Sequence, residues 1–154
     1  MPTTTRVFVR ASILYLILGA ALGALLLIND WLPLGSAVYY VKPAHVQFLI
    51  VGWLTQLILG VAWWLFPPMA FRLRGRDYPH GQAQRGSEPL FWVTFALLNA
   101  GVLLYAMGGP LYARTGSGFF GGLIFLSSLC LFAAAITFVI NMWSRVRELG
   151  RAKT

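Results

Sequence analysis

One histidine lies at the start of a long apolar segment and belongs to a stripe of residues that could hold a cofactor. Segment 46–66 contains no charged residue, and at about 1.5 Å rise per residue a helix of this length crosses the roughly 30 Å hydrocarbon core of a bilayer. Residues spaced by three, four and seven share one helix face. That face carries His45, Leu49, Gly52, Gln56 and Gly60, with Trp63 at its far end. The pattern predicts a haem-binding face on a membrane helix.

A haem site needs few protein groups, chiefly an iron ligand and space for the porphyrin, and this stripe contains residues of both kinds. An imidazole whose other ring nitrogen is hydrogen-bonded is a good axial ligand, and glycine beside it leaves room for a flat porphyrin. Trp53 is next to Gly52 and could flank the ring. We therefore take His45, Gly52, Trp53 and Gln56 as candidate haem-binding residues. The alternative is that the histidine bonds a carbonyl group and the glycines only allow helices to pack closely.

The elements that must position these residues are membrane helices. The chain has 154 residues, of which 58% are hydrophobic and 10% charged, whereas soluble domains carry about 25% charged residues. We predict an all-α polytopic membrane protein with one domain, residues 1–154. Its four transmembrane helices form a bundle and cover about residues 7–28, 44–66, 89–108 and 118–143.

The distribution of positive charge predicts how the helices are oriented. The positive-inside rule places basic loops in the cytoplasm. Of the twelve lysines and arginines, ten fall on one predicted side and only Lys42 and Arg114 on the other. The ten are Arg6, Arg10, Arg72, Arg74, Arg76, Arg85, Arg145, Arg147, Arg151 and Lys153. Both termini are therefore expected inside, in the cytoplasmic membrane of a bacterium or archaeon.

This orientation decides which residues can share a metal. His45 is expected at the external end of the second helix, whereas His80 lies in the basic loop a full membrane thickness away. The two histidines of one chain cannot bind the same iron. Met107, in the last turn of the third predicted helix, emerges at the depth of His45 and is a possible second ligand.

Several other functions are disfavoured. The net charge of +8 is explained by topology, so we expect lipid contacts and no nucleic-acid binding. Cys130 is the only cysteine, which excludes a covalent c-type haem motif. Predicted helices 7–28, 44–66, 89–108 and 118–143 contain no carboxylate, which argues against a proton pump. The amides of Gln56 and Asn99 are expected to join neighbouring helices and not to line a path. The tryptophans Trp53, Trp63, Trp64, Trp92 and Trp143 are expected mostly at the lipid surface.

The motif AHVQxxxxGWxxxxxxG, residues 44–60, followed by aromatic residues and Pro67, resembles the second transmembrane helix of haem-copper oxidase catalytic subunits. The resemblance is to the C-type oxidase and nitric oxide reductase branch, and to small four-helix membrane proteins described as oxidase-subunit-I-like. It covers the first two helices. In that superfamily the external histidine of this helix is an axial ligand of the low-spin haem, so the resemblance implies haem b bound by His45. The later helices that hold the binuclear centre have no counterpart here, and we expect no stand-alone catalytic activity.

The resemblance leaves the sixth ligand and the role open. The sixth ligand could be His45 of a second copy in a homodimer or larger oligomer, Met107, or a diatomic gas at an open site. The expected role is that of a cytochrome in electron transfer, haem handling or gas sensing, with a respiratory-chain partner. The alternative function is a haem-free accessory or assembly subunit of a respiratory membrane complex.

Overall fold

The structure is a computed structural model that describes residues 1–66 and 86–146, and its regular secondary structure is entirely helical. Four stretches are long and apolar enough to cross a membrane, and they correspond to the four predicted helices. These stretches are Thr3–Trp31, Ser36–Leu65, Glu88–Thr115 and Gly118–Trp143. The predicted all-α class is therefore confirmed for the described residues. His80 and the four arginines of its predicted loop lie outside them.

The first two stretches form a helical hairpin. Helix α1 covers Thr3–Trp31 and leads through residues 32–35 to a short 3₁₀ helix, η1, at Ser36–Val41. The second stretch then continues without a break through three segments: α2 at Lys42–Gln47, a π-helical segment η2 at Phe48–Thr55, and α3 at Gln56–Leu65. Segments with π-helical bonding are rare and often occur at functional sites. Here the π segment lies directly after His45.

The third and fourth stretches form a second hairpin, α4 at Glu88–Thr115 and α5 at Gly118–Val146. Helix α4 begins at Glu88, one residue before its predicted start, with Pro89 in the first turn. Ser87 caps the helix, because its side-chain oxygen accepts a hydrogen bond from the Leu90 N–H at 3.3 Å. It ends at Gly116, which adopts the left-handed conformation with φ of 65°.

Helix α4 is longer than its predicted range, which stopped at about residue 108 before Pro110. A proline inside a helix removes one backbone hydrogen bond and normally destabilises it. The flanking glycines allow close contacts that hold the helix together across this position. A Cβ atom added to Gly109 would lie 3.3 Å from Pro43 of α2, and one added to Gly108 would lie 3.1 Å from Leu123 of α5. Tertiary packing therefore extends α4 beyond its local sequence signal.

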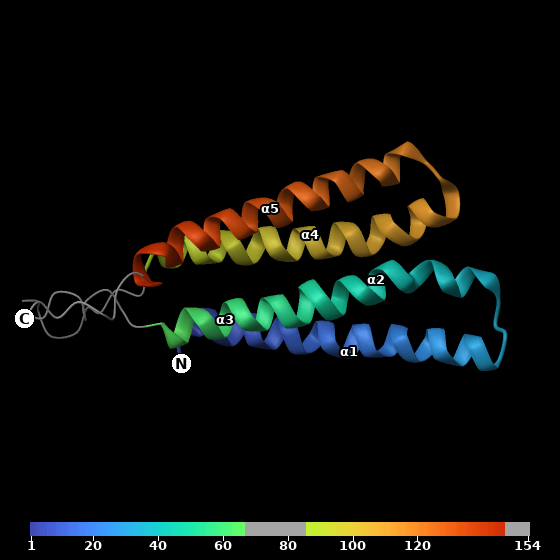
Figure 1. The fold of residues 1–154 in the computed structure, drawn as a ribbon, viewed down its shortest axis with the longest axis horizontal. Helices are drawn as coiled ribbons and strands as arrows, with labels where there is room; N and C mark the ends of the chain where they lie inside the picture. The colour runs from blue at the N-terminus through green and yellow to red at the C-terminus, as the bar shows by residue number, and fades with distance from the viewer. Residues whose placement is uncertain (67–85, 147–154) are drawn as a thin grey trace, which may run out of the picture.

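The two hairpins lie side by side, with α4 in contact with α1, with the second stretch and with α5 (Figure 1). Helix α5 packs chiefly on α4. We call the end with the two short links, residues 32–35 and 116–117, the connection end. The opposite end, where α1 begins and α3 and α5 finish, is called the terminal end.

The core of the bundle is an aromatic stack near the terminal end. The ring of Phe91 from α4 lies between Phe8 of α1 and Trp63 of α3, with centroid distances of 4.3 and 4.2 Å and interplanar angles of 10°. Met142 of α5 completes this buried cluster, so all four long stretches contribute to it. Trp63 is only 2% exposed, and the expectation of a surface position for it was therefore wrong.

Polar side chains tie the helix ends together beside this stack. The Asn141 amide binds both backbone groups of Ser87: its Oδ1 accepts from the Ser87 N–H and its Nδ2 donates to the Ser87 carbonyl, each at 2.9 Å. The guanidinium of Arg145 donates to the Trp63 carbonyl at 3.0 Å and to the Phe66 carbonyl, and it lies 5.0 Å from the centroid of the Trp63 ring. These bonds connect α5 to the start of α4 and to the end of α3.

Candidate functional site around His45 and the adjacent cavity

The stripe that contains His45 packs directly against α1. Added Cβ atoms at Gly52 and Gly60 would each come within 2.6 Å of α1 side chains, Tyr15 and Phe8 respectively. Glycines of α1 receive side chains of the second stretch in return. A Cβ at Gly19 would lie 2.6 Å from Leu49, and one at Gly23 would lie 2.6 Å from the His45 ring. Both helices therefore use glycine to bring their backbones close together, which is the packing that small residues favour between membrane helices.

His45 is half-buried and is oriented by a backbone group of α1. Its Nδ1 lies 2.8 Å from the carbonyl oxygen of Gly19. A carbonyl oxygen can only accept, so Nδ1 carries the proton and, in the neutral ring, Nε2 holds a free lone pair. The two ring nitrogens point in nearly opposite directions, and the lone pair is therefore directed away from Gly19. This arrangement of a backbone carbonyl and a histidine is the one that commonly orients metal-binding imidazoles.

Gln56 lies on the same stripe and is completely buried. Its exposed fraction is 0%, and neither its Oε1 nor its Nε2 has a hydrogen-bond partner. Another amide has partners on both of its polar atoms: Asn99 of α4 accepts from the Tyr15 hydroxyl at 2.9 Å and donates to the Phe95 carbonyl at 2.8 Å. The prediction that Asn99 joins neighbouring helices is confirmed. The same prediction for Gln56 was wrong, because neither of its amide atoms is bonded, and a buried amide without partners costs free energy.

Met107 points away from α2, the segment that carries His45. The face of α4 that contacts α2 is marked by Gly109. Two residues apart on a helix, these positions point in nearly opposite directions. Gly109 faces Pro43 of α2, whereas Met107 is 61% exposed. Trp53 is half-buried. Within residues 1–66 and 86–146, no group of three or more His, Cys, Asp or Glu side chains could hold a metal ion.

These positions can be compared with what a haem requires. The donor fits, because Nε2 of His45 holds a lone pair while Nδ1 is bonded to Gly19. The expected surroundings differ, because the space beside Gly52 and Gly60 is filled by Tyr15 and Phe8. A porphyrin on His45 could therefore not lie against Gly52 and Gly60 as expected, and Nε2 of His45 itself lies 3.5 Å from the position of a Cβ atom added to Gly23 of α1. The roles of Gly52, Trp53, Gln56 and Met107 as haem contacts stay predictions.

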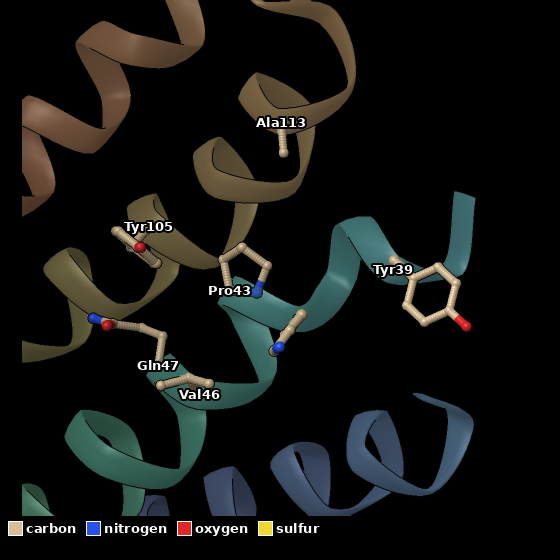
Figure 2. Close-up of a pocket in the computed structure, with 7 residues that line it drawn as sticks. Tyr39, Pro43, Val46, Gln47, Tyr105 and Ala113 are labelled. Carbon is tan, nitrogen blue, oxygen red and sulfur yellow. The ribbon is translucent and has the colours of Figure 1, made fainter. Parts of the chain in front are cut away.

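A cavity of about 430 Å³ lies beside this site, at the connection end of the bundle. It lies between the start of the second stretch and α4, and Figure 2 shows Pro43 and Gln47 of α2 beside Tyr105 of α4. Its lining consists of Tyr39, Lys42, Pro43, Val46, Gln47, Tyr105 and Ala113. Sequence reasoning placed Tyr39 and Lys42 near the membrane surface but did not find the cavity. The signal that could have found it is Gln47, a second polar residue two positions after His45 and therefore on nearly the opposite face of the helix.

Comparison with protein-family models, with curated proteins and with solved structures gives no match for this chain. The chain is an all-helical protein with four stretches long and apolar enough to span a bilayer, and its composition and lengths are compatible with an integral membrane protein.

Proposed function

We propose that all four helical stretches cross a membrane and that both termini are cytoplasmic. The proposal is supported by the length and hydropathy of the stretches and by the basic residues at the terminal end, Arg6, Arg10 and Arg145, against Lys42 and Arg114 at the connection end. A cysteine introduced at Lys42, in a Cys130→Ser background, should react with a membrane-impermeant thiol reagent applied to intact cells. A cysteine introduced at Arg6 should not, and the reverse pattern would overturn this topology.

Within that topology, we propose that the protein binds haem b near the external face, with His45 as an axial ligand. The single observation that carries the proposal is the 2.8 Å hydrogen bond from Nδ1 of His45 to the Gly19 carbonyl, which fixes the tautomer that can bind iron through Nε2. A haem held by such ligands changes between the ferrous and ferric states and so carries one electron. The role is then that of a cytochrome-like protein in electron transfer, haem handling or gas sensing.

The same geometry bears on the sixth ligand. Met107 is 61% exposed and lies on a helix face turned away from α2, so the histidine–methionine pair within one chain is not favoured. His45 of a second copy across a two-fold axis is the remaining protein ligand, and two-fold symmetry is the commonest in oligomers. A diatomic gas is the other occupant of that position. The first case gives about one haem per two chains and the second about one per chain.

One observation favours a different function, that of a haem-free accessory or assembly subunit of a respiratory membrane complex. Gly52 and Gly60, which a porphyrin was expected to lie against, are in contact with Tyr15 and Phe8 of α1. On this alternative, His45 joins α1 to α2 through the Gly19 carbonyl and binds no metal. The association with a respiratory complex rests on the resemblance of residues 44–60 alone.

An absorption spectrum of the detergent-purified protein separates the two functions. The protein should be produced in cells supplied with a haem precursor and measured oxidised and then reduced with dithionite. Sharp α and β bands in the reduced state are expected for a six-coordinate haem b, and His45→Ala should abolish them. Met107→Leu is the matched control and should leave the spectrum unchanged. A colourless wild-type protein, or full haem retention by His45→Ala, would overturn the haem proposal.

A further inference from the structure

The ring of His45 occupies the space that a side chain at Gly23 would need. A Cβ atom added to Gly23 would lie 2.6 Å from Cε1 of the ring, 3.1 Å from Nδ1 and 3.5 Å from Nε2. Carbon atoms pack best at about 3.5–4.0 Å, and 2.6 Å is well inside that distance. Because α1 continues as a helix on both sides of Gly23, a larger residue at this position would displace the imidazole.

The imidazole cannot move aside and keep its hydrogen bond. Its Nδ1 lies 2.8 Å from the Gly19 carbonyl oxygen, and N–H···O bonds extend only to about 3.2 Å. Moving Cε1 from 2.6 Å to an ordinary carbon contact requires a shift of about 1 Å. The backbone is packed here, since Ala44 is only 4% exposed. A ring that turns or slides by this amount therefore loses the Gly19 carbonyl.

Loss of this bond would change which ring nitrogen carries the proton. The Gly19 carbonyl holds the proton on Nδ1, because a carbonyl oxygen can only accept. Without that acceptor the proton is free to move to Nε2, where it blocks the lone pair that a metal ion needs. The space at Gly23 therefore decides which nitrogen of His45 is able to act as a ligand.

We propose that Gly23 is the positioning residue of the His45 site. Because Gly23 has no side chain, His45 reaches the Gly19 carbonyl, and its Nε2 remains the nitrogen that can bind iron. Gly19 and Gly23 are four residues apart and share one face of α1, where the first supplies the acceptor and the second the space. The step to iron rests on the haem function proposed above, whereas the position and the tautomer of the ring do not.

Nuclear magnetic resonance of the detergent-purified full chain without haem tests the proposal. The chain is labelled with ¹⁵N-histidine and carries His80→Gln, so that every imidazole signal belongs to His45. At about pH 9, where histidine side chains are neutral, the ¹⁵N shifts show which ring nitrogen is protonated. We expect the proton on Nδ1. Gly23→Ala should lower the ratio of the Nδ1–H form to the Nε2–H form by about tenfold, the equivalent of one lost hydrogen bond.

Gly60→Ala is the matched control for crowding between the same two stretches. Its added Cβ atom would also lie 2.6 Å from an atom of α1, the Cβ of Phe8, but it does not touch His45. The Nδ1–H form should persist in this variant. A proton on Nε2 without the Gly23 substitution, an unchanged ratio in Gly23→Ala, or an equal loss in Gly60→Ala would overturn the proposal.

A second comparison uses stability and needs no spectrum of the ring. Asparagine at position 45 places an amide N–H near the position of Nδ1 but has no atom at Cε1. Gly23→Ala should therefore lower the melting temperature less in a His45→Asn background than beside His45. An equal change in both backgrounds would disprove the contact between Gly23 and the ring.

Haem spectra of the same variants separate the positioning role from the haem function. Gly23→Ala should lose the reduced α and β bands together with the Nδ1–H form, and full haem binding by this variant would overturn the step to iron. A colourless wild-type protein with its proton on Nδ1 would overturn the haem function and leave the positioning role of Gly23 in place.

Discussion

Nη2 of Arg145, in the last turn of α5, lies 3.0 Å from the carbonyl oxygen of Trp63, near the end of α3. The arginine is 7% exposed, and its guanidinium also lies 5.0 Å from the centroid of the Trp63 ring. The last carbonyls of a helix have no partner within the helix and carry partial negative charge. Arg145 therefore satisfies the end of α3 and fixes α5, which otherwise packs chiefly on α4.

Removal of this side chain should destabilise the bundle. We expect Arg145→Ala to lower the free energy of unfolding by about 1–3 kcal/mol, the range for hydrogen bonds to charged groups. The free energy of unfolding of Arg145→Lys should lie between those of the wild type and Arg145→Ala, because lysine keeps the charge but lacks the planar guanidinium group. Thermal melts in detergent measure the effect, with the exposed Arg114→Ala as the control, expected within about 0.5 kcal/mol of wild type. An Arg145→Ala variant as stable as the control would show that the contact with Trp63 contributes nothing.

The close approach of α1 and α3 should depend on Gly60. Its added Cβ atom would lie 2.6 Å from the Cβ of Phe8, an atom next to the backbone that cannot rotate away. Gly60→Ala should therefore separate the helices, disturb the Phe8–Phe91 stack and destabilise the protein by about 1–3 kcal/mol, as overpacking does. Gly122→Ala, in α5, is the matched control because nothing lies within 4 Å of its added Cβ. Alanine in a helix normally stabilises relative to glycine, by up to about 1 kcal/mol. If Gly60→Ala and Gly122→Ala changed the melting temperature in the same direction relative to the wild type, this account would be contradicted.

Replacement of the unpartnered Gln56 should stabilise the protein, in contrast to the two substitutions above. Gln56 is 0% exposed and neither amide atom is bonded, so Gln56→Leu should be neutral or should stabilise the protein by up to about 1–3 kcal/mol through the removed desolvation cost. Asn99→Leu is the contrasting variant, since Asn99 bonds the Tyr15 hydroxyl and the Phe95 carbonyl, and it should destabilise. Destabilisation by Gln56→Leu in a thermal melt would instead indicate a buried water or ligand bonded to the amide.

The link between Asn141 and Ser87 should require an amide specifically. Its oxygen accepts from the Ser87 N–H and its nitrogen donates to the Ser87 carbonyl. Asn141→Asp keeps the acceptor but places a second carboxylate oxygen against that carbonyl at a residue only 4% exposed. We expect a loss of about 2 kcal/mol or more. Ser128→Ala, which removes only an exposed local bond to Ile124, should change the melting temperature little. Equal stabilities for the two variants would disprove the requirement.

The sequence by itself determined the four helices. Apolar stretches of about 20 residues have few alternatives in a lipid environment, because helices satisfy their backbone hydrogen bonds internally. Pro89 also located the start of α4 to within one residue, whereas the cap by Ser87 was seen only in the structure. The joining role of Asn99 was predicted correctly, but the same prediction for Gln56 was wrong, because whether a buried amide finds a partner depends on what the neighbouring helix places opposite it.

The tertiary structure alone decided what lies against each face. Helical spacing grouped His45, Gly52 and Gly60 correctly on one side, but a porphyrin and a neighbouring helix both favour small residues there, and the space is filled by Tyr15 and Phe8. Trp63 was expected at the surface because interfacial tryptophans are common, yet it lies in the core. The cavity beside Gln47 combines residues about 60 positions apart. In a membrane both lipid-facing and core-facing residues are apolar, so hydropathy locates helices but does not reveal which faces meet.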